Sequence, residues 1–287
     1  MATPAAVTGS KPRPSTSYGP GRRTFRELVG EEMVDIYVGP EEVHFRIHKR
    51  ILCDRVPYFQ KMFTSGFKEG SENAARFPED DPDSFDMLVD WIYFYNIRGL
   101  ARMKDSDGND IITWDPVRFY CLAEKLCLPM VMDNIMDTLR KYHKKMQELP
   151  SPDFIYRAYA STSDKSPLRN YCLMTIRYIL ADLGKDETEE GWPTSEIQKL
   201  FKDHDSFASD YITATRDGIS GDPRDLPKCF FHVHGEDEPC ITNDWNGKRK
   251  YYALPQQKHP KKQCLESAGP RASPASPSWS TAAMIGR

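Results

Sequence analysis

The chain has 287 residues, of which 39% are apolar and 28% are charged, and its formal net charge is −3. This ordinary globular mixture predicts one or two domains whose cores are large enough to fold without disulfides or a metal ion. The slight excess of acidic residues gives no electrostatic reason to expect nucleic acid or an anionic membrane as the main partner.

The cysteines and the apolar stretches point to a location inside the cell. Seven cysteines are scattered along the chain, and an odd number without a close framework is typical of reduced intracellular thiols. No secretory signal is expected from the first residues, and no stretch approaches the roughly 18 apolar residues of a membrane-spanning helix. We therefore expect an intracellular protein, in the cytoplasm, the nucleus or both. Basic clusters at 248–250 and 258–262 resemble a two-part nuclear import signal, and chance clustering is the alternative.

Composition also divides the chain into regions. Residues 1–24 and 255–287 are rich in Pro, Ser and Gly, which predicts disordered tails. Between them we expect an α+β domain over residues 25–147, a helical extension over 150–215 and a polar segment over 216–254.

The α+β domain is expected to begin with a hairpin. In residues 33–38, Val34, Ile36 and Val38 alternate with other residues, which indicates a strand with one buried face. Turn-forming residues follow at 39–42, and residues 43–48 alternate again, so the two strands should pair. A short third strand is expected within 73–77.

After the hairpin the apolar spacing changes to that of helices. Leu52, Val56, Phe59 and Phe63 are separated by four, three and four residues, and Pro57 suits the first turn of a new helix. We therefore expect two short helices that break near residues 54–56. Two later helices should begin where an aspartate with capping ability precedes a proline, at 81–82 and 115–116. The polar stretch 98–114 is expected to be an insertion, and further helices are expected at 131–142, 153–160, 167–183 and 195–202.

Six short motifs occur in a fixed order along this region: DIYVG at 35–39, FRIHKRIL at 45–52, YFQKMF at 58–63, FKEG at 67–70, PEDDPDSF at 78–85 and LVDWIY at 88–93. Together they resemble a BTB/POZ domain, of the variety common in fungal proteins, over about residues 33–145. The resemblance implies an α+β BTB/POZ fold, in which a short β-hairpin and small sheet pack on a helical cluster, followed by a C-terminal helical extension. It also implies a protein–protein interaction module.

The resemblance assigns structural roles to three polar residues. His48 would stand at the start of a helix and satisfy backbone groups there, and no carboxylate or nucleophile lies at a spacing that would favour catalysis. An acidic residue on the first strand commonly pairs with a basic residue near the dimer interface of such domains. That pair corresponds to Asp35 and Lys49 here, and the alternative is that Asp35 is an exposed charge on the strand.

The resemblance also implies partners. Members of the family dimerise, and many dock the N-terminal helices of a cullin scaffold in a ubiquitin ligase. A hydrophobic–x–Glu turn often marks the docking surface, and Phe67-Lys68-Glu69 fits it. The alternative is that Phe67 packs on its own domain and Glu69 is solvated. Residues 22–33, with Phe25 and Leu28 as apolar anchors, could contribute to a homodimer, and a monomer is the alternative.

A second candidate site lies near the C-terminus, in the sequence CFFHVHGEDEPC. Cys229, His232, His234 and Cys240 are zinc-type ligands, and two thiolates with two imidazoles complete a tetrahedron. Their spacing, C-x2-H-x-H-x5-C, is not that of a common zinc finger. The alternative is a solvated linker with two chance cysteines. A zinc ion here would be structural, because no general base is placed for catalysis.

We therefore expect a protein that is not an enzyme, since the chain contains no glycine-rich phosphate loop, nucleophile elbow or HExxH motif. Apart from structural zinc, no cofactor is expected. The leading hypothesis is an adaptor that presents substrates to a cullin-based ubiquitin ligase. The alternative is a nuclear scaffold or transcriptional regulator that uses the BTB/POZ domain only to dimerise. Neither membrane nor nucleic acid is expected as a partner.

Overall fold

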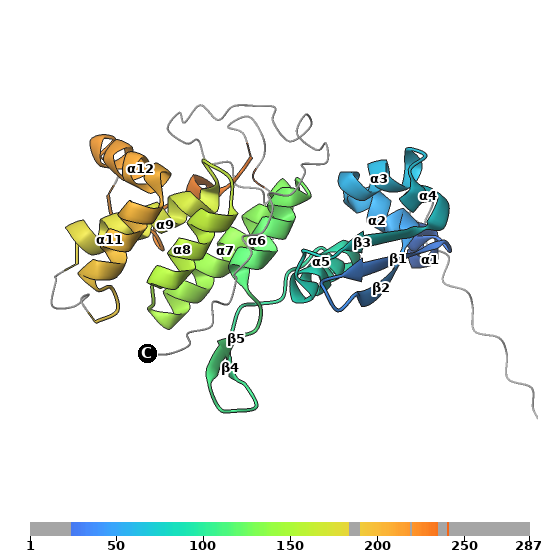
Figure 1. The fold of residues 1–287 in the computed structure, drawn as a ribbon, viewed down its shortest axis with the longest axis horizontal. Coiled ribbons are helices and arrows are strands. Elements are labelled where there is room, and N and C mark those ends of the chain that lie inside the picture. The colour runs from blue at the N-terminus through green and yellow to red at the C-terminus, as the bar shows by residue number, and fades with distance from the viewer. Residues whose placement is uncertain (1–23, 184–189, 219, 235–239, 241–287) are drawn as a thin grey trace, which may run out of the picture. The chain divides into compact units, whose positions relative to one another are not determined.

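A computed structural model describes residues 24–183, 190–218, 220–234 and 240 of the chain (Figure 1). The expected tails, apart from residue 24, and the basic clusters at 248–250 and 258–262 lie outside these residues. The chain divides into two compact units, which are described separately. The first extends to Pro82 and includes Ile92–Tyr95, and the second contains Asp83–Trp91 and the chain from Asn96 onward.

The first unit is built on a three-stranded sheet with the order β2-β1-β3. Strands β1 (Met33–Val38) and β2 (Val43–His48) form the expected antiparallel hairpin, and β3 (Ala74–Phe77) pairs with β1 in parallel. Gly39 makes the turn after β1 possible, because its φ of 77° lies in the left-handed region. The alternation in β1 sends Val34, Ile36 and Val38 into the core, where each is 0% exposed.

Four short helices accompany this sheet: α1 (Phe25–Val29), α2 (Lys49–Arg55), α3 (Pro57–Thr64) and α4 (Lys68–Glu72). Helices α2 and α3 confirm the expected pair, because Val56 has extended backbone between them and Pro57 opens α3. Helix α4 was not expected, since none of its residues is buried and its sequence has no apolar stripe. Helix α5 (Pro82–Phe94) begins at the expected proline and contributes residues to both units.

The polar insertion at 98–114 forms a small hairpin of its own, visible in Figure 1, from β4 (Arg102–Lys104) and β5 (Asp110–Ile112). The Asp105 carboxylate accepts backbone N–H groups from Asp107 and Asn109, which closes the turn. At the base of the hairpin, Trp114 Nε1 donates to the carbonyl of Arg98 at 3.1 Å. The insertion is therefore an ordered element with its own hydrogen bonds.

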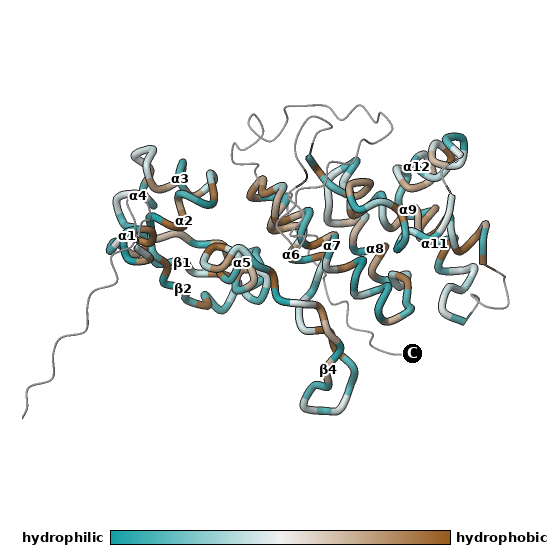
Figure 2. The backbone as a smooth tube through the Cα atoms, turned by 180° about the vertical axis from the view of Figure 1, so that it is seen from behind, coloured by the Kyte–Doolittle hydropathy of each residue, from teal (hydrophilic) through white to brown (hydrophobic). Residues whose placement is uncertain are grey.

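The rest of the second unit is helical, and apolar and polar residues alternate along its helices (Figure 2). Asp115 caps α6 as expected by accepting the N–H groups of Val117 and Arg118. Helix α12 lies within the expected helical extension, but its bounds were not predicted, because its only buried residue is Phe207. The helices are α6 (Pro116–Lys125), α7 (Pro129–Met146), α8 (Pro152–Ser161), α9 (Pro167–Ala181), α11 (Thr194–Asp203) and α12 (Asp205–Arg216), followed by the 3-10 helix η1 (Lys228–Phe231).

Among the helices that the structure describes, none combines the length and the apolar character needed to cross a membrane.

Candidate functional site

Phe67 and Glu69 lie at the start of helix α4 on the first unit. Phe67 is the residue before the first turn, has extended backbone and is 60% exposed, so its ring does not pack into its own domain. Glu69 follows in the first turn and is half-buried. The geometry therefore offers a large apolar side chain and a carboxylate at one end of a short helix, which is a combination that a partner protein can bind.

A close backbone contact fixes helix α4 against the end of α3. A Cβ atom added at Gly70 would lie 2.9 Å from the carbonyl oxygen of Phe63, so only glycine fits at this approach. The backbone N–H of Gly70 donates to the carbonyl of Phe67 at 3.1 Å. The glycine of the FKEG motif thus holds the helix that carries Phe67 and Glu69.

A polar network ties down the other end of α4. Asn73 ends the helix in the left-handed conformation, and its side-chain oxygen accepts from Lys49 Nζ at 2.8 Å. Lys49 Nζ also lies 3.0 Å from Glu32 Oε1, which accepts from Asn73 Nδ2 at 3.0 Å. The hydrogen bond from Lys49 lowers the pKa of Glu32 below its ordinary value. Sequence reasoning missed Glu32 and Asn73, although an asparagine after a short polar helix is a known ending signal.

Asp35 and Lys49 therefore have different partners within one chain, and the pair inferred from the resemblance is not the contact that the structure shows. Asp35 Oδ1 lies 2.7 Å from His44 Nε2 and 3.8 Å from Arg46 Nε. The reason is the register of the hairpin, which places Asp35 opposite Arg46. Lys49 lies beyond the end of β2 and turns toward Glu32.

His48 stands immediately before helix α2, as expected, but its side chain makes no capping hydrogen bond. Its Nδ1 lies 2.7 Å from the hydroxyl of Tyr93, near the end of α5, and that hydroxyl also accepts the backbone N–H of His48 at 3.1 Å. The expectation that the imidazole satisfies backbone groups of the helix is wrong, because the imidazole Nδ1 is hydrogen-bonded to the Tyr93 hydroxyl instead. The contact gives His48 a structural role that links β2 to α5.

Helix α1 presents two apolar side chains to solvent. A capping box between Thr24 and Glu27 begins the helix, and Gly30, with a φ of 79°, ends it. Phe25 is 62% exposed and Leu28 is 36% exposed, whereas Val29 is buried. The expected anchors for self-association thus lie on an ordered helix and not in the core of their own domain.

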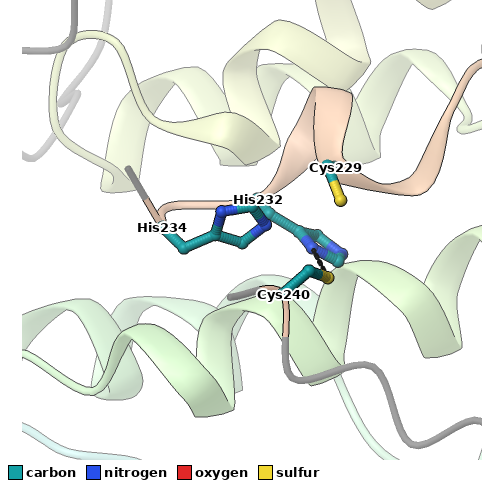
Figure 3. Close-up of side chains that lie close together, drawn as sticks. All are labelled: Cys229, His232, His234 and Cys240. Atoms are coloured by element: carbon teal, nitrogen blue, oxygen red, sulfur yellow. Dashed lines mark hydrogen bonds between the residues drawn. The ribbon is translucent and has the colours of Figure 1, made fainter. Parts of the chain in front are cut away.

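The Cys/His cluster of the second unit is brought together as the sequence predicted. The ligand atoms of Cys229, His232, His234 and Cys240 all lie within 4.8 Å of one another. Figure 3 shows the side chains directed toward a common centre, with Cys240 Sγ and His232 Nδ1 joined at 3.4 Å. Within the described part of the chain, this group could hold a metal ion, and no such geometry is expected of a solvated linker.

Comparisons with known proteins agree with the first unit's fold. The family model for the BTB/POZ domain matches residues 25–142. Kelch-like protein 38 from Homo sapiens is 25% identical to this chain over 170 residues, which make up 55% of this chain and 27% of that protein. The chain therefore covers little more than a quarter of this relative's length.

The family match begins with α1 and ends at residue 142, within the last turns of α7. It includes the three-stranded sheet, the α2–α3 pair and the hairpin insertion. The six motifs that carried the resemblance all lie within it. Their order agrees with the observed succession of hairpin, helical pair, parallel strand and helices. These observations identify residues 25–142 of this chain as a BTB/POZ domain.

Proposed function

We propose that the protein is an adaptor of a cullin-based ubiquitin ligase. In this proposal the surface formed by Phe67 and Glu69 docks the N-terminal helices of a cullin, and the helices after residue 150 hold the substrate protein. The observation that carries the proposal is the 60% exposure of Phe67 beside a carboxylate at the start of α4. The resemblance to BTB/POZ adaptors supplies the class of partner.

The chemistry of the surface supports docking of a helical partner. An aromatic side chain that enters a groove is a typical hot spot of a protein interface, and a nearby carboxylate can accept hydrogen bonds or meet a basic residue. Lys68 Nζ lies 3.6 Å from Glu72 Oε1, one helical turn further along α4. Because Lys68 pairs with Glu72, the Glu69 carboxylate can interact with a partner protein. Because Gly70 and Asn73 hold α4 in place, docking needs little ordering of the chain, which favours affinity.

The test compares the affinity of two variants of the full chain for a recombinant N-terminal cullin fragment. Phe67→Ala with Glu69→Ala should weaken binding by tenfold or more, since loss of a hot-spot side chain costs about 2 kcal/mol or more. The matched control is Phe94→Ala with Glu41→Ala, which also removes an exposed aromatic ring and a surface carboxylate. Equal affinity of the wild type and the Phe67/Glu69 variant would reject this docking surface.

The exposed face of α1 favours a second candidate function, a nuclear scaffold or regulator that uses the BTB/POZ domain for self-association. Phe25 and Leu28 are apolar and exposed on a helix that is capped at its start, as a homodimer interface requires. Light scattering of the full chain and of Phe25→Ala with Leu28→Ala measures this association. A dimer that these substitutions dissociate, together with absent cullin binding, would favour the scaffold over the adaptor.

A further inference from the structure

We propose that Cys229, His232, His234 and Cys240 bind one zinc ion, and that this ion fastens the segment of residues 222–234 onto helix α7. The site is separate from the proposed docking surface and needs no cullin. It belongs to the second unit, where the segment follows the last long helix.

The distances among the ligand atoms suit tetrahedral zinc. With Zn–S bonds of about 2.3 Å and Zn–N bonds of about 2.0 Å, a sulfur and a nitrogen ligand lie roughly 3.5 Å apart. Cys240 Sγ and His232 Nδ1 are 3.4 Å apart, and all four ligand atoms lie within 4.8 Å of one another. A small movement of the side chains would therefore close the tetrahedron around an ion.

Three of the four donors are also shielded from water, and His234 is half-buried. Cys229 is 4% exposed, His232 is 4% exposed and Cys240 is 5% exposed. Polar side chains buried in this way need compensating partners, and a metal ion bound by two thiolates and two neutral imidazoles satisfies all four with no net charge. Because the protein supplies all four ligands, the ion would have no open position for a substrate and would be structural.

Helix α7 provides the outer partners that a zinc-binding histidine normally has. The Nδ1 atom of His232 faces Cys240, and its Nε2 atom lies 3.2 Å from a carboxylate oxygen of Asp137. One helical turn away, Asp133 accepts the backbone N–H of Val233 at 2.7 Å. A carboxylate on the second ring nitrogen fixes the tautomer and orientation of a ligating histidine, and its loss commonly weakens metal binding.

These aspartates belong to a continuous polar face of α7 that binds the segment along its length. Arg140, one turn beyond Asp137, donates through Nε to the carbonyl of Pro223 at 3.3 Å. Lys144, a further turn along, lies 2.5 Å from Asp225. The segment therefore runs antiparallel to α7, with hydrogen bonds and an ion pair at one end and the Cys/His cluster at the other.

An apolar anchor lies between the two ends. Phe231 is 0% exposed, its ring meets Tyr171 of α9 edge to face at 5.2 Å, and the Arg140 guanidinium lies 4.9 Å from its ring centre. Helix η1, which carries Phe231 and Cys229, contacts both α7 and α9. Zinc would hold this anchor by joining the chain on its two sides through Cys229 and Cys240.

The direct test is the zinc content of the full chain, purified in the presence of a thiol reductant and measured by mass spectrometry of the metal. We expect one zinc per wild-type chain and none in Cys229→Ser with Cys240→Ser. The control, Cys53→Ser with Cys121→Ser, changes two thiols outside the cluster and should keep one zinc. Zinc-free wild type, equal zinc in all three proteins, or a Cys229–Cys240 disulfide under reducing conditions would overturn the proposal.

A second test does not depend on variants that lack a ligand. Wild-type protein stripped by a chelator is titrated with cobalt, whose visible absorption reports tetrahedral coordination by thiolates, and zinc then displaces it. Asp137→Asn keeps all four ligands and should lower zinc affinity by about 10–100-fold, whereas Asp153→Asn, on exposed α8 surface, should not. Absence of the cobalt bands would overturn the site, and unchanged affinity in Asp137→Asn would overturn its attachment to α7.

Hydrogen exchange of the same wild-type protein tests the fastening. Removal of zinc should raise amide exchange in residues 222–234 and leave α11 and α12 unchanged. Equal exchange with and without zinc would contradict a fastening role.

Discussion

The side-chain nitrogen of Lys49 lies 2.8 Å from the side-chain oxygen of Asn73, so the first residue of α2 is joined to the residue that ends α4. The same nitrogen binds the carboxylate of Glu32, in the residue before β1. Three segments that are distant in sequence thus meet at one cation. The Lys49 side chain is only 18% exposed, whereas the Glu32 side chain is 58% exposed, so the network lies at the edge of the first unit with its cation largely covered.

Replacement of Lys49 by Met should lower the free energy of unfolding by about 1 kcal/mol, because the part-buried side-chain oxygen of Asn73 loses its hydrogen-bond donor. Urea unfolding of wild type and variant measures the change. Arg50→Met is the control, since Arg50 makes an exposed pair with Asp54 at 3.9 Å and its loss should change stability by less than about 0.5 kcal/mol. Equal losses in the two variants would show that the network adds nothing.

The link between His48 and Tyr93 gives a second prediction. Tyr93→Phe removes the hydroxyl that receives the backbone N–H of His48 and pairs with its imidazole, and should cost about 1–2 kcal/mol of stability. Tyr37→Phe is a matched control, because the Tyr37 ring stacks on His44 and its contact does not use the hydroxyl. Thermal unfolding compares the stability of the two variants. A Tyr93→Phe variant as stable as the wild type would contradict the structural role of the contact between His48 and Tyr93.

Gly70→Ala should disturb the docking surface without changing Phe67 or Glu69. The new methyl group would lie 2.9 Å from the Phe63 carbonyl, so α4 must shift, at a cost of about 1–3 kcal/mol. Affinity for the cullin fragment should fall together with stability. At Gly99 an added Cβ meets nothing within 4 Å, and Gly99→Ala should leave both measurements unchanged. Wild-type affinity in Gly70→Ala would mean that the position of α4 is unimportant for docking.

His143 makes the second unit sensitive to acid. Burial and, as the smaller cause, the positive charge of nearby Arg224 lower the pKa of His143 from its ordinary 6.5 to about 4. The folded protein therefore does not take up a proton that the unfolded chain binds below pH 6.5. Stability should be full above pH 6.5, fall as the pH drops through that value and level off near pH 4, with a total loss of about 3 kcal/mol.

Urea unfolding between pH 7 and pH 4 measures this loss. The His143→Gln variant should lose less stability over that range, although its loss of the contact to the Tyr171 hydroxyl, at 2.9 Å, lowers its stability at pH 7. Parallel curves for wild type and His143→Gln would contradict the assignment.

Local chemistry allowed much of the fold to be predicted from the sequence. Period-two alternation located β1, and a proline after an extended residue located the break between α2 and α3. Asp115 before Pro116 located the start of α6. The spacing of Cys229 to Cys240 placed four zinc-type ligands in one cluster. Each of these signals depends on residues that are close in sequence, where propensity and capping decide the structure.

The contacts that position the sites could not be predicted in the same way. Lys49 meets Asn73, His48 meets Tyr93, and His232 meets Asp137, and in each case the partners are brought together by packing of distant elements. The sequence around a polar side chain does not indicate which distant residue that side chain will contact. No helix was predicted at α4, and the bounds of α12 were not predicted within the helical extension, because both sequences bury too few apolar residues to show a helical period.

The measurement that tests the adaptor proposal most directly is a calorimetric titration of the wild-type full chain with a recombinant N-terminal cullin fragment. The proposal predicts saturable binding of one fragment per chain, with a Kd of about 10 μM or tighter. No heat of binding at the highest soluble concentrations, from protein that circular dichroism shows to be folded, would contradict it.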